Sequence, residues 1–417
     1  KDELEGFIAH TLTRKYNGQA APTLALVSPT AFQDLSKRYT TPDGVQENVN
    51  IALYASAMKD VAAKYKVHFV DAFGPTKDWF SSSSTPLTRD GALLTNDGYA
   101  KLAPVLIDAL FGPDQSRTSR NIESSALNDA IAEKNWLWMN YYKIPNGVHV
   151  FGRRHRPHGP KNYPSELTKL AEMMAVRDQA VWAALAGTTF DLDAADAKTS
   201  PLVDMGEPKR TYLPVMESAK GLAVPQGYKI ELFASDEMFP NLANPVQMSF
   251  DNKGRLWIAT MPSYPHYQPG DPKPDDKLLI LEDTNNDGKA DKETVFADGL
   301  HLPMGFEFGA DGVYVSQGYS LVHLRDTNGD DTSDIREVVM SGFDDHDTHH
   351  AISAFCADPS GAFYMGEGTF LHSNVETAYG TIRSSNGGFF RYNPARRKLE
   401  RSVRLSIPNP WGIAFDE

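Results

Sequence analysis

The densest group of titratable side chains is the segment 344–350, which reads Asp-Asp-His-Asp-Thr-His-His. It stands directly before an apolar run, so we expect it on a loop at one end of a β-strand. Histidine is suited to take a proton from a sugar hydroxyl, and a neighbouring aspartate can fix the tautomer of its ring. The residues that we predict to be catalytic are Asp347, His349, His350 and Arg383. Glu367 and Asn409 stand on later predicted loops and are expected to converge on the same site.

The same segment allows two other interpretations. His346, His349 and His350 together could ligate a metal ion, because imidazole nitrogens are common zinc ligands. Alternatively, the loop has no catalytic role, and its histidines cap strands or pack against aromatic rings. The residue types alone leave both alternatives open.

Two acidic loops form a second group of candidate residues. Each follows an apolar strand, in the segments 278–291 and 321–334, and the two copies start roughly 40 residues apart, a period typical of propeller blades. Calcium takes hard oxygen ligands, and alternate residues of a tight turn bring such oxygens to one point. The predicted calcium ligands are Asp283, Asn285, Asp287, Asp291, Asp326, Asn328, Asp330, Asp334 and Glu337. The alternative is an acidic Asx-turn without an ion, and Asp331, where a glycine is usual, strains the second turn.

The elements that would position these residues repeat as well. Strand, Asp/Gly turn and strand recur in the segments 245–259, 306–315 and 352–365, and a fourth copy begins at Trp411. Aspartate and glycine stand where a hairpin needs unusual backbone angles. A propeller needs at least about four blades to close around its axis. We therefore expect an incomplete all-β propeller over residues 223–417, in a chain that is a piece of a longer protein.

Residues 1–112 have a different pattern, in which helices alternate with short apolar strands. This alternation predicts a three-layer α/β domain with a parallel sheet between helices. The predicted helices cover 2–16, 48–66 and 95–111, and the predicted buried strands cover 23–28 and 67–71. His68 begins the second strand and is expected to be structural.

This first region resembles the C-terminal half of the SGNH (GDSL-type) hydrolases, through the segments 25–29, 70–71 and 87–99. The family's final block reads Asp-Gly-x-His, and its aspartate and histidine complete a Ser-His-Asp triad. The resemblance places Asp90 on the family's aspartate and Leu93 on its histidine. A leucine cannot accept a proton, so it cannot activate a serine. We expect a degenerate hydrolase module, with an active esterase or deacetylase as the alternative.

Residues 113–222 are predicted to be a helical connector and linker. The segments 125–142 and 164–186 have helical periodicity, and the second is clearly amphipathic. Between them lies the basic loop 151–160, an anion clamp or a loop packed on a neighbouring domain. His155 and His158 within it are a weak candidate pair of metal ligands.

Residues 223–417 resemble the propeller of the membrane-bound dehydrogenase domain family, which is itself similar to sorbosone and soluble quinoprotein glucose dehydrogenases. The segments 225–228, 244–245, 250–257 and 347–350 carry the resemblance, together with the acidic loops. It implies oxidation of a sugar or polyol hydroxyl with pyrroloquinoline quinone, a histidine of the last segment acting as base. It also implies a secreted or periplasmic location.

Composition narrows the classes of partner. The 417 residues carry a formal net charge of −13, which argues against nucleic acid and anionic membranes as partners. No apolar run reaches the ~18–20 residues that span a bilayer, and Cys356 is the only cysteine. We predict a multidomain protein, α/β followed by connector and propeller, that acts on a carbohydrate or polyol. The alternatives are a calcium-stabilised carbohydrate-binding scaffold without catalysis and an SGNH esterase.

Overall fold

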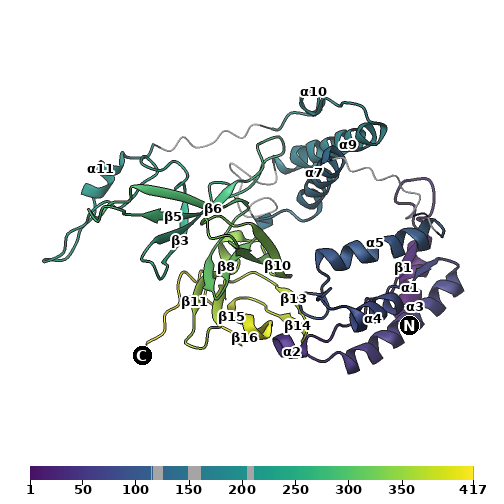
Figure 1. The fold of residues 1–417 in the computed structure, drawn as a ribbon. Coiled ribbons are helices and arrows are strands. Elements are labelled where there is room, and N and C mark those ends of the chain that lie inside the picture. The colour runs from purple at the N-terminus through teal and green to yellow at the C-terminus, as the bar shows by residue number, and fades with distance from the viewer. Residues whose placement is uncertain (114, 116–124, 149–160, 204–210, 417) are drawn as a thin grey trace. The chain divides into compact units, whose positions relative to one another are not determined.

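The structure, a computed structural model, describes residues 1–113, 115, 125–148, 161–203 and 211–416 (Figure 1). Contacts group the chain into two units. The first comprises residues 1–122 with the short segments 377–380 and 394–398, and the second comprises the remainder. The basic loop 151–160, with His155 and His158, lies outside the described residues, and so do both of its interpretations, an anion clamp and a loop packed on a neighbouring domain.

The first unit is α/β, as predicted. Strands β1 (Ala25–Val27) and β2 (His68–Val70) pair in parallel. The helices are α1 (Asp2–Leu12), α2 (Ser36–Tyr39), α3 (Val45–Tyr65), α4 (Phe73–Ser82) and α5 (Asn96–Phe111). Helix α5 begins where predicted because the Thr95 side chain accepts a hydrogen bond from the Gly98 N–H, which satisfies a free donor of the first turn.

The prediction that both strands of this unit are buried is confirmed only in part, at Val70, which is fully buried. Val27 is 41% exposed and His68 is also exposed. In the part of the chain that the structure describes, each strand has only the other as a neighbour, so one edge of each lacks a covering strand.

The connector is helical in the second unit, as the periodicity indicated. Its helices are α7 (Ser125–Tyr142), α9 (Tyr163–Ala186), α10 (Leu192–Asp196) and α11 (Val215–Lys220). Helices α7 and α9 pack against each other (Figure 1), through Leu137, Leu170 and Met173. Helix α9 ends at Gly187, which has φ of +69°. This is the left-handed conformation that glycine adopts readily at the end of a helix.

Three four-stranded antiparallel sheets follow, each with its strands in simple sequential order. The strands of the first are β3 (Pro245–Phe250), β4 (Leu256–Thr260), β5 (Asp276–Glu282) and β6 (Lys292–Leu300). Those of the second are β7 (Phe306–Gly309), β8 (Gly312–Gln317), β9 (Ser320–Arg325) and β10 (Ile335–Ser341). Those of the third are β11 (Ser353–Ala357), β12 (Phe363–Glu367), β15 (Gly388–Asn393) and β16 (Lys398–Val403), with the pair β13 (Asn374–Thr377) and β14 (Gly380–Arg383) inserted.

Consecutive sheets share buried apolar clusters. Trp257 and Ile280 of the first sheet lie in one cluster with Val322 of the second. Tyr314 of the second sheet lies in another cluster with Phe363 of the third. The middle sheet therefore buries residues of both faces, which explains why β9 is buried from Ser320 to Leu324 without alternation, His323 included.

The predicted Asp/Gly hairpins are confirmed. Gly254 and Gly361 have φ values of +78° and +81°, which glycine adopts at no steric cost. The side chains of Asp251 and Asp358 each accept hydrogen bonds from backbone N–H groups of their own turn. The same local chemistry thus closes β3–β4 and β11–β12.

Two segments expected to continue this pattern are not strands. Residues 224–234, expected to enter the β region, and the fourth copy at 411–416 have no strand assignment. A strand needs a neighbour for its N–H and C=O groups, and the described sheets place no strand beside either segment. Among the described residues, no helix is both long and apolar enough to span a membrane.

Candidate functional site

The segment 344–350 forms the connection between β10 and β11, so the predicted position on a loop is confirmed. It ends in a single 3-10 turn, Thr348–His350. The loop is anchored by its first residue: Asp344 accepts hydrogen bonds from the backbone N–H groups of His346, at 2.9 Å, and His372, at 2.7 Å. Its own N–H donates to Ser373 Oγ. These bonds hold the loop to the segment after β12.

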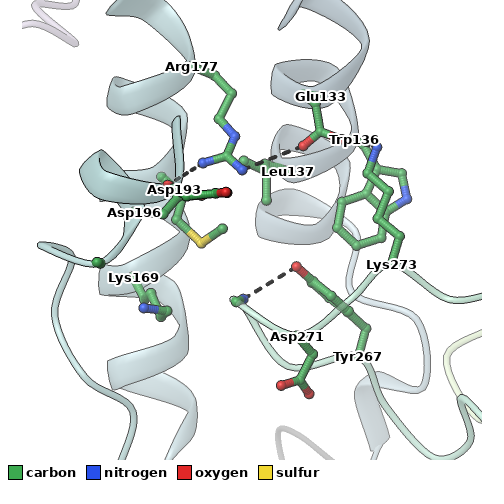
Figure 2. Close-up of a pocket in the computed structure, with 13 residues that line it drawn as sticks. Glu133, Trp136, Leu137, Lys169, Arg177, Asp193, Asp196, Tyr267, Asp271 and Lys273 are labelled. Carbon is green, nitrogen blue, oxygen red and sulfur yellow. Dashed lines mark hydrogen bonds and ion pairs between the residues drawn. The ribbon is translucent and has the colours of Figure 1, made fainter. Parts of the chain in front are cut away.

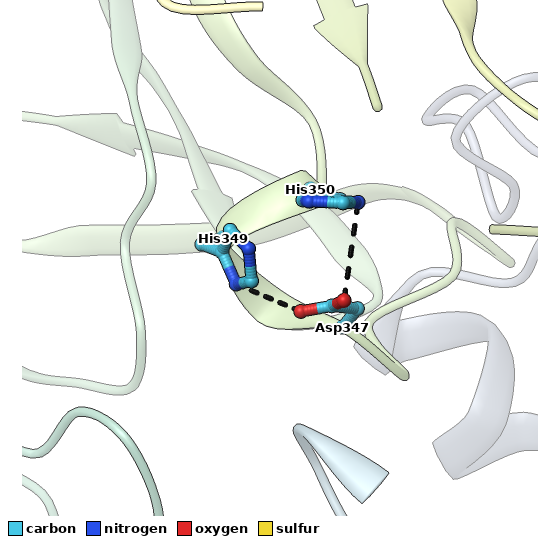
Figure 3. Close-up of side chains that lie close together, drawn as sticks. All are labelled: Asp347, His349 and His350. Atoms are coloured by element: carbon cyan, nitrogen blue, oxygen red, sulfur yellow. Dashed lines mark ion pairs between the residues drawn. The ribbon is translucent and has the colours of Figure 1, made fainter. Parts of the chain in front are cut away.

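Asp347, His349 and His350 converge at the end of this loop (Figure 3). His349 Nδ1 lies 2.7 Å from Asp347 Oδ1, and His350 Nδ1 lies 3.9 Å from Asp347 Oδ2. The two imidazole rings pack edge to face, with their centroids 4.2 Å apart. Among the residues that the structure describes, these form the one group of three His, Cys, Asp or Glu side chains whose ligand atoms all lie within 4.8 Å.

The three side chains differ in their access to solvent. The His349 side chain is 25% exposed, whereas those of Asp347 and His350 are 6% and 5% exposed. His350 Nδ1 lies 2.7 Å from the Thr369 carbonyl oxygen, and its ring stacks on Phe370. A carbonyl oxygen only accepts, so Nδ1 of His350 carries the proton. His350 is thereby fixed in place, and His349 is the histidine that a ligand can reach.

Asn146, a residue of the connector, is hydrogen-bonded to this loop. It was not among the site residues that the sequence predicted. Its side-chain oxygen accepts from the Thr348 N–H at 3.0 Å, and its backbone N–H donates to the Asp345 carbonyl oxygen at 3.0 Å. Its amide group donates to the Pro265 carbonyl oxygen at 2.7 Å. Asn146 is fully buried and has φ of +59°. The Asn-Gly dipeptide directly after an aromatic helix is the sequence signal that could have indicated a special turn.

Two further acids are buried close to the loop. Asp345 is 2% exposed, and burial raises its pKa to about 6, against the opposing charge of Lys143. Glu367 at the end of β12 is fully buried, and burial raises its pKa, while hydrogen bonds from Ser373 and Ser384 oppose that rise. Burial penalises the charged form of a carboxyl group, so both acids keep their protons to higher pH than free side chains do.

The other residues predicted for this site lie elsewhere. Arg383 is exposed on β14, and its Nε donates to Asn374 Oδ1 at 2.9 Å. The exposed side chain of His346 is not part of the converging group, whose third member is Asp347. Glu367 binds Ser373 rather than either histidine.

The acidic loops have the hydrogen bonding of Asx-turns. Asp326 accepts from four backbone N–H groups, those of residues 328–331, and Asp283 accepts from those of Asp287 and Gly288. Asp331 has φ of +63°, the strained conformation that we expected, and its carboxylate pairs with Arg255. Glu337 lies on β10 opposite His323, with its carboxylate 3.8 Å from Arg325. The loop oxygens are thus occupied by donors of the chain itself, and calcium binding stays a prediction.

Asp90 closes its own turn. Its Oδ1 accepts from the backbone N–H groups of Ala92 and Leu93, both at 2.9 Å, and the residue is 7% exposed. Leu93 contributes only its backbone to this contact. The geometry gives Asp90 the role of a turn residue.

A separate pocket of about 440 Å³ lies beside α7, α9 and the loop that contains Tyr267 (Figure 2). Four of its charged side chains pair with one another: Arg177 with Glu133 and Asp196, and Lys273 with Glu133. Burial raises the pKa of the Tyr267 hydroxyl to about 12. The mutual pairing of these groups makes this pocket a structural tie between the helices and the loop.

Comparisons with known proteins give distant similarity only. No curated protein matches the chain. An iodide structure of a Trichoderma reesei enzyme of carbohydrate-active family AA12 is 14% identical over 35% of this chain and 34% of that one, with a TM-score of 0.27. A luciferin-regenerating enzyme is 12% identical over 39% of this chain and 58% of that one, with a TM-score of 0.25. The matched region thus spans about a third of the first structure's length and less than two thirds of the second's. Residues 214–417 match the model of a family described as a domain of unknown function, DUF7133.

Proposed function

We propose that Asp347 and His349 form the proton-accepting pair of an enzyme that oxidises a hydroxyl group of a sugar or polyol. The observation that carries the proposal is the 2.7 Å contact between Asp347 Oδ1 and His349 Nδ1, with the aspartate buried and the histidine partly exposed. A carboxylate this close to Nδ1 favours the tautomer with the proton on Nδ1 and the lone pair on Nε2, the nitrogen that can take a substrate proton.

The chemistry is a balanced two-electron oxidation. His349 Nε2 takes the hydroxyl proton, and a bound two-electron acceptor would take the hydride from the same carbon, so that a carbonyl group remains. Asp347 stabilises the imidazolium that forms, because a charge-assisted hydrogen bond is stronger than a neutral one. His350 is a positioning residue, since the Thr369 carbonyl and the Phe370 ring hold its imidazole against that of His349.

Pyrroloquinoline quinone is the acceptor that the sequence resemblance implies. This quinone carries three carboxylates and needs cationic partners. The residues that bond to the loop include Asn146, Val148, Gly368, Thr369, His372 and Ser373. Lys143 is a cation near the loop, since its charge lowers the pKa of Asp345, and the proposal leaves the identity of the acceptor open.

The architecture supports a sugar-dehydrogenase type of protein. We infer that the three sheets are consecutive propeller blades, because each is a four-stranded antiparallel meander and neighbours share buried clusters. Propeller ligands bind at loop ends of the blades, where segment 344–350 stands. The secreted or periplasmic location implied by the sequence resemblance belongs to this proposal.

The test is a dye-linked oxidation assay on the full chain with a panel of aldoses and polyols and an added quinone. We expect activity that His349→Ala lowers by roughly 10²–10⁴-fold, the usual contribution of a general base. His68→Ala, which changes an exposed histidine of the first unit, is the matched control and should leave the rate unchanged. Equal rates for His349→Ala and the control would overturn the proposal.

A second candidate function is the binding of a divalent metal ion by the same three side chains. The observation that favours it is that one ligand atom from each of the three side chains lies within 4.8 Å of the other two. Zinc accepts two imidazoles and a carboxylate with an open fourth position. Saturable zinc binding in a calorimeter, lost in His350→Ala as well as His349→Ala, would favour this function over the base, and no binding would exclude it.

A further inference from the structure

A second pocket, of about 510 Å³, lies beside the third sheet. It is lined by His372, Ser373, Asn374, Arg383, Ser384 and Arg401, together with Ser385. The lining side chains come from both flanks of the β13–β14 insertion and from β16. All of them offer hydrogen-bond donors, and none of them is an acid.

Positive charge dominates this pocket. The Nε–H of Arg383 donates to the side-chain oxygen of Asn374 at 2.9 Å. Asn374 is neutral, so this bond does not compensate the positive charge of Arg383. Two acids stand beside the lining. One is Glu367, whose pKa is raised by burial and lowered, to a smaller extent, by the charge of Arg401. The other is Asp344, which accepts from the His372 N–H. Neither lines the pocket itself.

Arg401 provides the more specific feature. Its Nε and Nη2 are buried and have no hydrogen-bond partner among the described residues. These two nitrogens lie on one edge of the planar guanidinium, the edge that binds two oxygens of a carboxylate, sulfate or phosphate at once. Unsatisfied buried donors cost free energy, so an oxyanion that accepts from them after a small side-chain movement would remove that cost.

The pocket is distinct from the Asp347–His349 pair. The catalytic loop leads into β11, whereas Arg401 lies on β16, and these two strands form opposite edges of the same sheet. Three strand spacings separate the edges by about 14 Å. The two sites are nevertheless linked, because Asp344 accepts from the backbone N–H of His372.

We propose that this pocket binds an oxyanion, a carboxylate or a sulfate or phosphate group of a ligand, through Arg401 and Arg383. The hydroxyls of Ser373 and Ser384 in the pocket wall hydrogen-bond to Glu367, so the two arginines supply the donors for the anion. This binding site stands apart from the oxidation proposed above, so either can hold without the other.

The experiment is calorimetric titration of the full chain with sodium sulfate, sodium phosphate and galacturonate, at constant ionic strength made up with chloride. Galactose is the neutral counterpart of galacturonate. We expect saturable binding of at least one anion, weakened about tenfold or more in Arg401→Gln and in Arg383→Gln, since each removes charge-assisted hydrogen bonds. Arg401→Lys should weaken binding almost as much, because it keeps the charge but loses the two-nitrogen edge.

Arg404→Gln is the matched control, because Arg404 is an exposed arginine three residues along the chain that does not line the pocket. Arg383→Gln changes an exposed hairpin residue and keeps the test valid if Arg401→Gln fails to fold. Preference for galacturonate identifies a carboxylate ligand, and preference for sulfate or phosphate identifies a tetrahedral one. Absence of saturable binding, or equal weakening by Arg404→Gln, overturns the proposal.

Discussion

The two units each contain a buried aspartate at a position predicted to be catalytic, and the two aspartates have different partners. Asp90 in the first unit accepts from backbone N–H groups of its own turn. Asp347 in the second unit contacts the imidazoles of His349 and His350. The buried carboxylates are chemically alike, so the difference in role lies in what the fold brings to each one: a leucine backbone in one case and an imidazole in the other.

The largest effect on the oxidation rate is expected when Asp347 is exchanged for asparagine, and the same exchange at Asp90 is its control. Asp347→Asn leaves His349 without the negative charge that stabilises its protonated form, so we expect the oxidation rate to fall by roughly 10²–10⁴-fold. Asp90→Asn should leave that rate unchanged. The dye-linked assay measures both, and an equal response of the two variants would remove the distinction between the sites.

Asn146→Ala tests whether the connector positions the loop that carries His349. The variant loses the bonds to the Thr348 N–H and the Pro265 carbonyl and must place alanine at φ of +59°. We expect the free energy of unfolding to fall by about 2–4 kcal/mol, measured by urea denaturation.

Asn146→Gly is its control, because glycine adopts φ of +59° without strain; it loses only the side-chain bonds and should cost less. An Asn146→Ala protein as stable as the wild type would show that the loop does not depend on this residue.

The buried Asp345 should make stability depend on pH. Its folded pKa of about 6 lies above its ordinary value of 3.8, so the folded state holds its proton more tightly than the unfolded state does. The contribution of protonated Asp345 to the free energy of unfolding is therefore full below about pH 4 and is lost as the pH rises to about 6. This contribution is on the order of 1–3 kcal/mol.

Asp345→Asn, which cannot ionise, isolates this contribution from that of Glu367. The difference in unfolding free energy between variant and wild type should change across the same pH range. A constant difference would contradict the shifted pKa.

Asp90→Ala should have a small effect confined to stability. It removes two hydrogen bonds to backbone N–H groups of a turn, and we expect a loss of about 1 kcal/mol. Leu93→His, which restores the histidine of the hydrolase pattern, should produce no acetyl-ester hydrolysis. Measured hydrolysis by that variant would show that Asp90 can leave its turn.

Calcium should have the smallest effect, because the oxygens of both acidic loops already accept backbone N–H groups. We expect a rise in Tm of a few degrees at most when about 1 mM calcium is added, with magnesium as the control. Asp330→Asn should remove any such rise in the second loop. A large, saturable rise would instead show that the loops rearrange into calcium sites.

Much of the fold could be predicted from local pattern. Helices α7 and α9 and the Asp/Gly hairpins form where periodicity and turn residues place them, because both depend on neighbours within a few positions. The wrong predictions concern the burial and pairing of strands, which depend on residues far away in the sequence. Segment 224–234 reads as a strand but has no described strand beside it, and the strand at 23–28 is less buried than its apolar composition indicates.

For the candidate site, the residue types could be read from the chain alone, since three histidines among aspartates admit few kinds of chemistry. Which of these side chains act together depends on the folded structure. It places His346 in solvent, seats His350 on Thr369 and Phe370, and leaves His349 partly exposed on Asp347. It also brings in Asn146, about 200 residues away along the chain, through hydrogen bonds that only the packed fold forms. The reason is physical: a side chain's chemistry is fixed by its covalent structure, whereas its pKa, tautomer and access depend on groups that folding brings beside it.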